Sequence, residues 1–259
     1  MKRMSWLFLL ACGYGLALSH GNLQTTALAS FALLALAALG LRYAPLKVAA
    51  HGLFIALAVG LALHWLPGFN NGLVIDNARL EPDATPLTLY LNLDKPLIGF
   101  WLLLACPWLL PRSAAPSRCL AGLSALLTLT VVLVLAGALL LGVVAWAPKW
   151  PEQGWLWVAN NLLLVCIVEE LLFRGYVQGG LQRLLQNRPY AQAAVLPGTA
   201  VLFGLAHAGG GWEWALLATG AGLGYGLAYR QAGLAGAVLC HFALNLAHFT
   251  LFTYPMLAR

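Results

Sequence analysis

Charged residues are scarce in this chain. Asp, Glu, Lys and Arg make up 8% of its 259 residues and 61% are hydrophobic, whereas ordinary soluble domains contain about 25% charged residues. Apolar runs recur from one end of the sequence to the other, many near the length of about 20 residues that crosses a bilayer. The shortage of charge excludes a soluble protein, and the sequence predicts a single integral-membrane domain over residues 1–259.

Two further absences narrow the possible functions. The five cysteines show no CxxC spacing, so neither a disulfide framework nor a thiolate metal site is predicted. The net charge is +6, but the basic residues are scattered singly at the ends of apolar runs and form no patch. A nucleic-acid partner is therefore excluded, and the lipid bilayer is the expected surroundings.

The apolar runs predict an all-α polytopic transmembrane bundle of about eight or nine helices. The first run resembles a signal peptide, but the second follows almost at once, so a retained helix is expected. The longest polar connection, residues 67–96, contains the alternating stretch TLYLNL, which predicts either a short strand or a segment lying on the membrane surface. The runs lie near residues 5–19, 23–41, 46–66, 97–110, 119–147, 155–173, 195–208, 212–229 and 233–254.

The distribution of basic residues predicts an N-terminus inside the cell. With alternate connections on opposite sides, ten basic residues share the N-terminal side and four lie on the other, and cytoplasmic loops attract Lys and Arg. The connection 67–96 is then external. The ten are Lys2, Arg3, Arg42, Lys47, Arg112, Arg118, Arg174, Arg183, Arg188 and Arg230, and the four are Arg79, Lys95, Lys149 and Arg259.

Residues 175–188, GYVQGGLQRLLQNR, have an amphipathic pattern. Val177, Leu181, Leu184 and Leu185 share one helical face, which is typical of an interfacial helix. We expect GYVQGG to turn the chain out of the preceding span, and the following helix to lie along the inner membrane surface.

Few ionisable residues interrupt the predicted spans: Glu169, Glu170, His207, His241 and His248. Such groups are costly at membrane depth and normally face the bundle interior or a water-filled cavity. Counting 1.5 Å per residue, Glu169, His207 and His241 can meet at one depth if the helix of His207 begins near Pro197, a position suited to a first turn.

Three pairs of polar or aromatic residues are spaced i and i+4, so each pair shares a helical face. They are Glu170 with Arg174, Phe203 with His207, and His241 with Asn245. Glu169 lies about 100° around the helix from Glu170 and is left for chemistry. Each group also has a purely structural interpretation. The Glu170–Arg174 pair could fix the orientation of its helix, or Arg174 could snorkel to the membrane interface. His207 could form a hydrogen bond between helices, and His248 could be a packing residue.

Three short motifs follow one another on successive apolar runs. EELLFR, FGLAH and HFALN are similar to the EExxxR, FxxxH and HxxxN motifs of the CAAX protease and bacteriocin-processing (CPBP, or Abi) family of intramembrane proteases. The resemblance covers residues 155–254, the expected catalytic core, whereas residues 1–147 carry no such motif.

The resemblance implies an endopeptidase that cleaves a membrane-associated protein or peptide near its terminus. It implies Glu169 as the base that activates water and His207 as its assistant, with Glu170, Arg174 and Phe203 in support. By the same resemblance, His241 and Asn245 hold or polarise the scissile carbonyl, which an amide N–H can do in an oxyanion hole.

The sequence leaves open whether a metal takes part. Zinc could be held by Glu169, His207 and His241, but HExxH is absent and the ligands would come from three helices. A metal-free glutamate mechanism without a cofactor is the preferred interpretation.

Two other functions compete with proteolysis. One is a proton-coupled transporter, in which the glutamates and histidines form a relay. The polar residues, however, all lie in the second half, whereas many carriers have two related halves. The other is a catalytically silent immunity or scaffold protein, although every motif residue is present.

The distribution of basic residues and the compact size of the chain fit a protein of a bacterial inner membrane.

Overall fold

The computed structural model describes residues 2–109 and 120–258. The chain is predominantly helical, which confirms the all-α membrane class. Five of the described helices are long and apolar enough to cross a membrane, and three more are apolar but shorter. Arg112, Arg118, Cys119 and Arg259, which the sequence analysis used, lie outside the described residues.

The chain divides into two compact units. The first comprises residues 1–74 and 89–110, and the second comprises residues 75–88 and 111–259. All the residues predicted to carry chemistry belong to the second unit.

The first unit contains α1 (Lys2–Ser19), α2 (Leu28–Gly40), α3 (Lys47–Ala62) and α4 (Lys95–Ala105), with short 3-10 turns at Thr25–Ala27, Ala44–Leu46 and Pro107–Leu109. Aromatic packing joins these helices: the rings of Phe54 and Trp101 stack with centroids 3.7 Å apart. The Trp101 indole donates to the Leu34 carbonyl at 2.8 Å. Asp94 caps α4 by accepting a hydrogen bond from the Lys95 amide.

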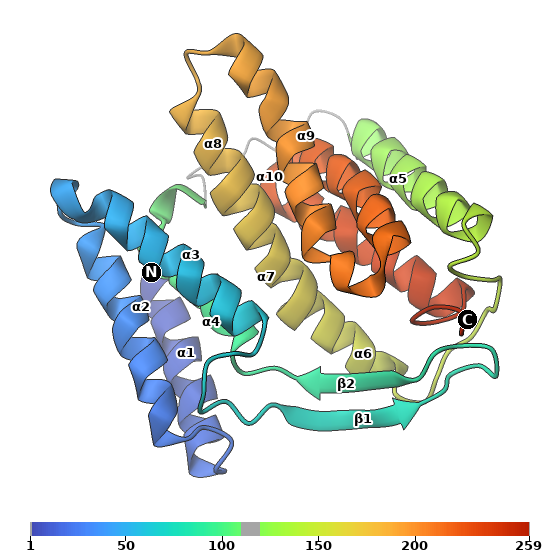
Figure 1. The fold of residues 1–259 in the computed structure, drawn as a ribbon, viewed down its shortest axis with the longest axis horizontal. Coiled ribbons are helices and arrows are strands. Elements are labelled where there is room, and N and C mark those ends of the chain that lie inside the picture. The colour runs from blue at the N-terminus through green and yellow to red at the C-terminus, as the bar shows by residue number, and fades with distance from the viewer. Residues whose placement is uncertain (1, 110–119, 259) are drawn as a thin grey trace. The chain divides into compact units, whose positions relative to one another are not determined.

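Strands β1 (Gly72–Ala78) and β2 (Leu87–Leu91) pair in a two-stranded sheet. Their arrows run in opposite directions in Figure 1, so the connection 67–96 contains an antiparallel hairpin. The sequence predicted either a short strand or a surface segment at TLYLNL, and the structure has the strand. The boundary between the two units passes through this hairpin.

A continuous helical stretch of the second unit runs from Gly154 to Leu184 (Figure 1). The expected turn at GYVQGG is wrong: the backbone stays helical through Gln178 and Gly179. The buried Gln178 side chain donates to the Gly226 carbonyl at 3.1 Å, so this segment packs on a neighbouring helix instead of leaving the bundle. The stretch consists of α6 (Gly154–Asn160), the π-helical η4 (Asn161–Cys166), α7 (Ile167–Glu170), the π-helical η5 (Leu171–Gln178) and α8 (Gly179–Leu184).

Helix α9 (Pro189–Ala206) begins earlier than the sequence suggested. Pro189 occupies the first turn, where a missing N–H costs nothing, and Pro197 lies inside the helix. The predicted start near Pro197 is therefore wrong, because α9 takes its favourable N-terminal proline from the preceding connection.

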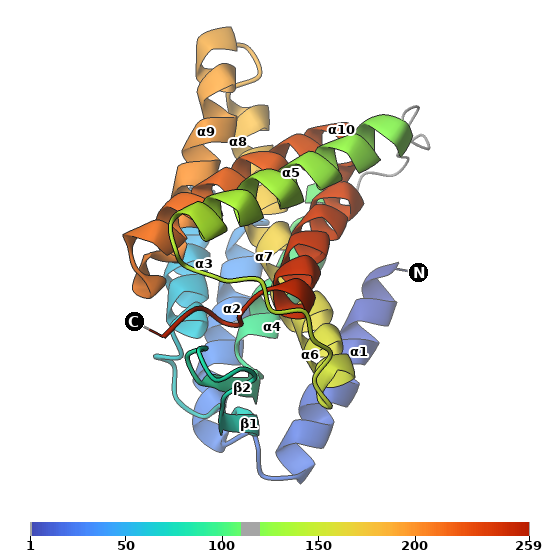
Figure 2. The same ribbon diagram turned by 90° about the vertical axis from the view of Figure 1, so that its right-hand side faces the viewer.

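Helix α10 (Trp212–Leu251) consists of two halves, as the two separate apolar runs predicted. The backbone leaves helical geometry at Ala232 and Gly233, and the φ of +65° at Gly233 is one that glycine adopts readily. Helix α5 (Leu120–Leu140) runs alongside α10 (Figure 2). This helix lies within residues 1–147, which carry none of the three motifs and were predicted to lie outside the catalytic core.

A C-terminal strap, residues 252–258, follows α10. It forms backbone hydrogen bonds with the segment after α5, from Leu257 N to Val143 O at 2.9 Å and from Thr253 N to Ala145 O at 2.9 Å. A third bond runs from Thr85 N to Met256 O at 2.8 Å and ties the strap to the connection between β1 and β2.

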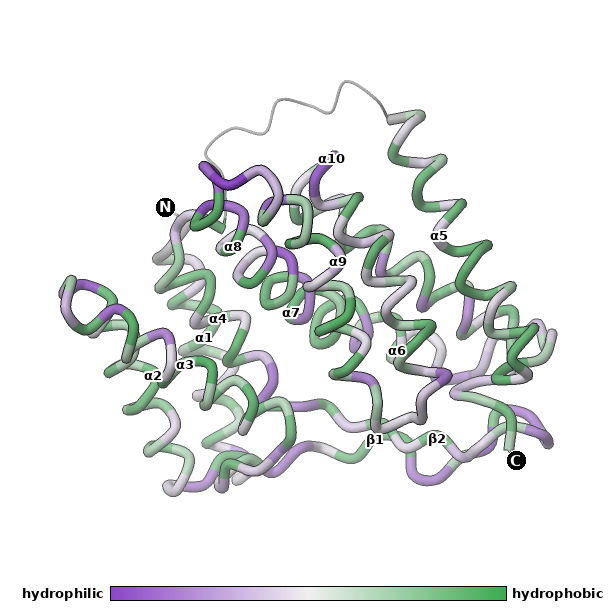
Figure 3. Tube along the Cα trace, turned by 45° about the horizontal axis from the view of Figure 1, so that its top comes forward, coloured by the Kyte–Doolittle hydropathy of each residue, from purple (hydrophilic) through white to green (hydrophobic). Residues whose placement is uncertain are grey.

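Hydropathy along the chain agrees with a membrane protein. Figure 3 shows hydrophobic residues along the helices and hydrophilic residues at connections such as the one between α8 and α9.

Candidate active site

The two adjacent carboxylates lie on α7, a single helical turn between the π-helical segments η4 and η5. A π-helix bonds i to i+5, is rare, and occurs frequently at functional sites. Glu169 and Glu170 point to different partners, a separation expected for neighbouring helical positions.

Glu170 joins the Gly154–Leu184 stretch to α10 through one oxygen atom. Its Oε1 accepts from Arg174 Nη1 at 3.2 Å and from His241 Nδ1 at 2.9 Å. The side chains of Glu170 and Arg174 are 0% and 1% exposed. Arg174 is buried and therefore does not snorkel. Because both atoms of this ion pair are withdrawn from solvent, the pair is a structural centre that holds the imidazole of His241.

Aromatic rings enclose the Arg174 guanidinium. Its central carbon lies 4.3 Å from the Phe203 ring centroid and 5.2 Å from that of Tyr225, both within the range of a cation–π interaction. Nη2 also donates to the Gly222 carbonyl at 3.2 Å. The buried charge is therefore compensated by a carboxylate, a carbonyl and two π faces.

Glu169 faces His207. Glu169 Oε2 lies 4.0 Å from His207 Nε2, and the two side chains are 28% and 37% exposed. The histidine directly follows the last residue of α9, which brings it beside Glu169 even though its helix begins at Pro189. The two side chains are thus partly exposed, whereas those of Glu170 and Arg174 are fully buried.

The backbone fixes the orientation of His207. Its Nδ1 lies 2.8 Å from the Phe203 carbonyl, and because a carbonyl only accepts, Nδ1 carries a proton. In the neutral ring Nε2 is then an acceptor directed toward the carboxylate. Glu169 Oε2 is buried as an atom and has no hydrogen-bond partner among the described residues.

Asn245 lies in a second polar cluster. Its Nδ2 donates to Asn161 Oδ1 at 3.2 Å, and the Cys166 thiol donates to the same oxygen at 3.2 Å. A longer contact of 3.7 Å joins Asn245 Nδ2 to Cys166 Sγ. The structure thus brings Asn245 to η4 and His241 to Glu170, although the two residues share one helix.

Sequence reasoning missed Asn161 and Tyr225. Asn161 belongs to a pair of amides inside an apolar run, and amides bond between membrane helices. Unlike Asn245, it has no histidine or carboxylate four residues away, so helical spacing did not single it out. Tyr225 is 1% exposed and stacks on the His241 ring, with centroids 4.5 Å apart and planes inclined by 16°. A tyrosine between glycines in a predicted span was the available signal.

The three residues considered for zinc do not form a ligand set. Within residues 2–109 and 120–258, no group of three or more His, Cys, Asp or Glu side chains is arranged to hold a metal ion. His241 Nδ1 is bound to Glu170, and Glu170 is bound to Arg174. Glu169, His207 and His241 do not form such a group in this arrangement of the described residues.

Comparison with known families supports the resemblance carried by the motifs. The model of the type II CAAX prenyl endopeptidase Rce1-like family matches residues 150–247, a segment that contains all three motifs. No curated protein and no solved structure matches the chain significantly. The family match and the apolar helices indicate an integral membrane protein, and at the level of the family they support an intramembrane endopeptidase with a protein or peptide substrate.

Proposed function

We propose that this protein hydrolyses a peptide bond of a membrane-associated protein or peptide with a water molecule activated by Glu169. The observation that carries the proposal is the accessible Glu169–His207 pair, with 4.0 Å between Oε2 and Nε2. This separation is too long for a direct hydrogen bond of about 2.7–3.2 Å, but one water can donate to both acceptors.

The chemistry needs no further reactant. Glu169 accepts a proton from the water as its oxygen bonds to the scissile carbonyl carbon. Collapse of the tetrahedral intermediate breaks the C–N bond, and the proton on Glu169 passes to the leaving nitrogen. The products are a carboxylic acid and an amine, and the glutamate is restored.

Asn245 and His241 are the donors that we assign to the carbonyl oxygen of the substrate. An amide nitrogen carries two N–H donors: one binds Asn161, whereas the other makes only the weak 3.7 Å contact with Cys166 and can be redirected to an oxyanion. For His241, Nδ1–H donates to Glu170, so it is the protonated ring that has an Nε2–H left to donate to the carbonyl oxygen. Glu170 and Arg174 thereby act as positioning residues that orient the ring.

The proposed mechanism uses no metal. It predicts that purified protein keeps its activity after exhaustive treatment with EDTA and 1,10-phenanthroline. A loss of activity restored by zinc would require a rearranged site in which Glu169, His207 and His241 meet.

We place the protein in a bacterial inner membrane with its N-terminus inside. The basic residues on the N-terminal side support this orientation. Leader peptides and C-terminal sorting segments of exported proteins are the substrate class that fits such a membrane.

The decisive experiment replaces Glu169 with Gln, which keeps the shape and removes the base. Cells producing the wild type or Glu169→Gln at equal levels are compared by mass spectrometry of protein N- and C-termini. We expect termini that appear only with the wild type. Glu152→Gln, at an exposed glutamate before α6, is the matched control and should behave as wild type. Identical termini for wild type and Glu169→Gln would overturn the proposal.

A further inference from the structure

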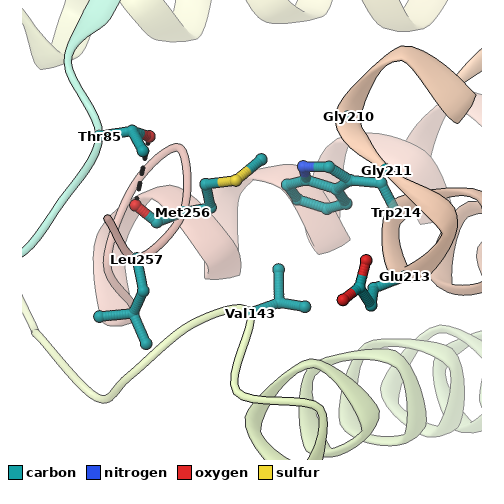
Figure 4. A pocket seen from close by; sticks show the side chains of 8 residues that line it. All are labelled: Thr85, Val143, Gly210, Gly211, Glu213, Trp214, Met256 and Leu257. Atoms are coloured by element: carbon teal, nitrogen blue, oxygen red, sulfur yellow. Dashed lines mark hydrogen bonds between the residues drawn. The ribbon is translucent and has the colours of Figure 1, made fainter. Parts of the chain in front are cut away.

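A small cavity lies next to the His207 loop. Its volume is about 280 Å³, below the roughly 300–1,000 Å³ of pockets for drug-sized ligands and suited to a single side chain. Its lining residues come from four separate segments of the second unit: Thr85, Val143, Gly210, Gly211, Glu213, Trp214, Met256 and Leu257 (Figure 4).

Glu213 and Trp214 give the cavity its chemistry. Of the eight lining residues, Glu213 is the charged one, and Figure 4 shows its carboxylate and the Trp214 indole directed toward the space between α10 and the C-terminal strap. A carboxylate beside an indole face is a combination that binds a cation, through a charge-assisted hydrogen bond and a cation–π contact.

Several features hold these walls in place. A Cβ added to Gly210 would lie 2.0 Å from Trp214 Cδ1, so only a glycine lets the loop lie against the indole. The ring centroids of Trp214 and His248 lie 5.8 Å apart. On the opposite wall of the cavity, the Thr85 hydroxyl donates a hydrogen bond to the Met256 carbonyl. The cavity is therefore built by tertiary contacts on several sides.

The cavity lies a short distance along the chain from His207, the partner of Glu169. Gly210 donates its amide to the His207 carbonyl at 3.1 Å, and three residues of chain separate their Cα atoms by at most about 11 Å. An extended peptide advances about 3.3 Å per residue. A side chain within about three residues of a scissile bond at Glu169 and His207 would therefore be near enough to enter this cavity.

We propose that the cavity of Glu213 and Trp214 is a specificity subsite that binds a lysine or arginine side chain of the substrate, within about three residues of the scissile bond. This inference rests on the proposed peptidase function for its distance from the cleavage point, whereas the binding of a cation does not depend on catalysis. It narrows the substrate to membrane-associated peptides with a basic residue close to the cleavage site.

The first test measures binding without cleavage. Saturation-transfer NMR on the detergent-solubilised protein compares acetyl-arginine methylamide with acetyl-citrulline methylamide, which has a similar shape but no charge. We expect the arginine probe to bind about tenfold more tightly, the effect of one charge-assisted hydrogen bond. Glu213→Gln should abolish the difference and Glu152→Gln should keep it. Equal binding of the two probes by the wild type, or an unchanged preference in Glu213→Gln, overturns the subsite.

The second test uses cleavage of a degenerate peptide library, analysed by mass spectrometry. Products of the wild type should be enriched in Lys or Arg at one fixed position near the cut, and Glu213→Arg should replace this preference with Asp or Glu. Cleavage without basic enrichment overturns the subsite and leaves the peptidase standing. Binding of the arginine probe together with full activity of Glu169→Gln would instead overturn the proposed mechanism and leave the cation site standing.

Discussion

The imidazole of His207 lies between a backbone carbonyl and a carboxylate: Nδ1 is 2.8 Å from the Phe203 oxygen, and Nε2 is 4.0 Å from Glu169 Oε2. The last turn of α9 thus fixes both the tautomer and the direction of the ring. Of the two ring nitrogens, only Nε2, which faces Glu169, remains available to bind water.

We predict that His207→Ala lowers kcat by about 10²-fold or more, the usual contribution of a positioned acid–base group, with little change in KM. Steady-state kinetics on a substrate identified through the Glu169→Gln comparison would measure this. His20→Ala, at an exposed histidine of the first unit, is the control. An undiminished kcat would remove His207 from the reaction.

Asn161 should act through Asn245. Asn161→Ala removes the acceptor that holds the Asn245 amide at 3.2 Å, and we expect kcat to fall about tenfold through misorientation of a transition-state donor. In the Asn245→Ala background the same substitution should have almost no further effect, because the two residues form one unit. The adjacent Asn160→Ala is the control. Additive effects in the double variant would show that Asn161 acts independently.

Arg174 is expected to govern stability. Arg174→Met leaves the fully buried Glu170 without its guanidinium, and breaking a buried ion pair from one side costs about 3–5 kcal/mol. The double variant Glu170→Gln/Arg174→Met should recover part of this loss. Equilibrium unfolding in mixed micelles measures the free energy of unfolding, with the exposed Arg188→Met expected to change it by less than about 0.5 kcal/mol. Equal effects at Arg174 and Arg188 would contradict the burial argument.

Gly204 should be intolerant of even one methyl group. A Cβ at this position would lie 2.5 Å from the Ala215 carbonyl oxygen and 1.9 Å from Thr219 Oγ1. Gly204→Ala therefore has to push the end of α9, with His207, away from α10. We expect a loss of about 1–3 kcal/mol from overpacking, together with a lower kcat.

Gly198 provides the matched control on the same helix. A Cβ there meets nothing within 4 Å, so Gly198→Ala should be neutral or stabilise the helix by about 0.5–1 kcal/mol. If the two alanine variants had equal stability and activity, the close approach of α9 to α10 would not hold the site.

Much of the architecture could be predicted because its causes are local. The bilayer requires long apolar runs, so the helices and the division of α10 at Gly233 were readable from composition and from one glycine. The cost of ionisable groups in such runs also exposed Glu169, Glu170, His207 and His241 as a candidate group. Local spacing further placed Glu170 and Arg174 on one face.

The predictions that were wrong depended on contacts between helices. GYVQGG contains turn-forming glycines, but Gln178 bonds to Gly226 and the helix continues. The start of α9 was misplaced because two prolines offered equivalent signals, and the depth of His207 was counted from the wrong one.

The sequence by itself determined the membrane class, the candidate residues and the order of the three motifs, because hydrophobicity, helical period and the cost of buried charge act within each segment. Tertiary structure alone decided which groups meet. It seals Glu170 with Arg174 and His241, leaves Glu169 facing His207, anchors Asn245 on Asn161, and gathers Thr85, Val143, Glu213 and Met256 around one cavity. These outcomes depend on distances of a few ångströms between helices, which are set by close packing at residues such as Gly204 and Gly210.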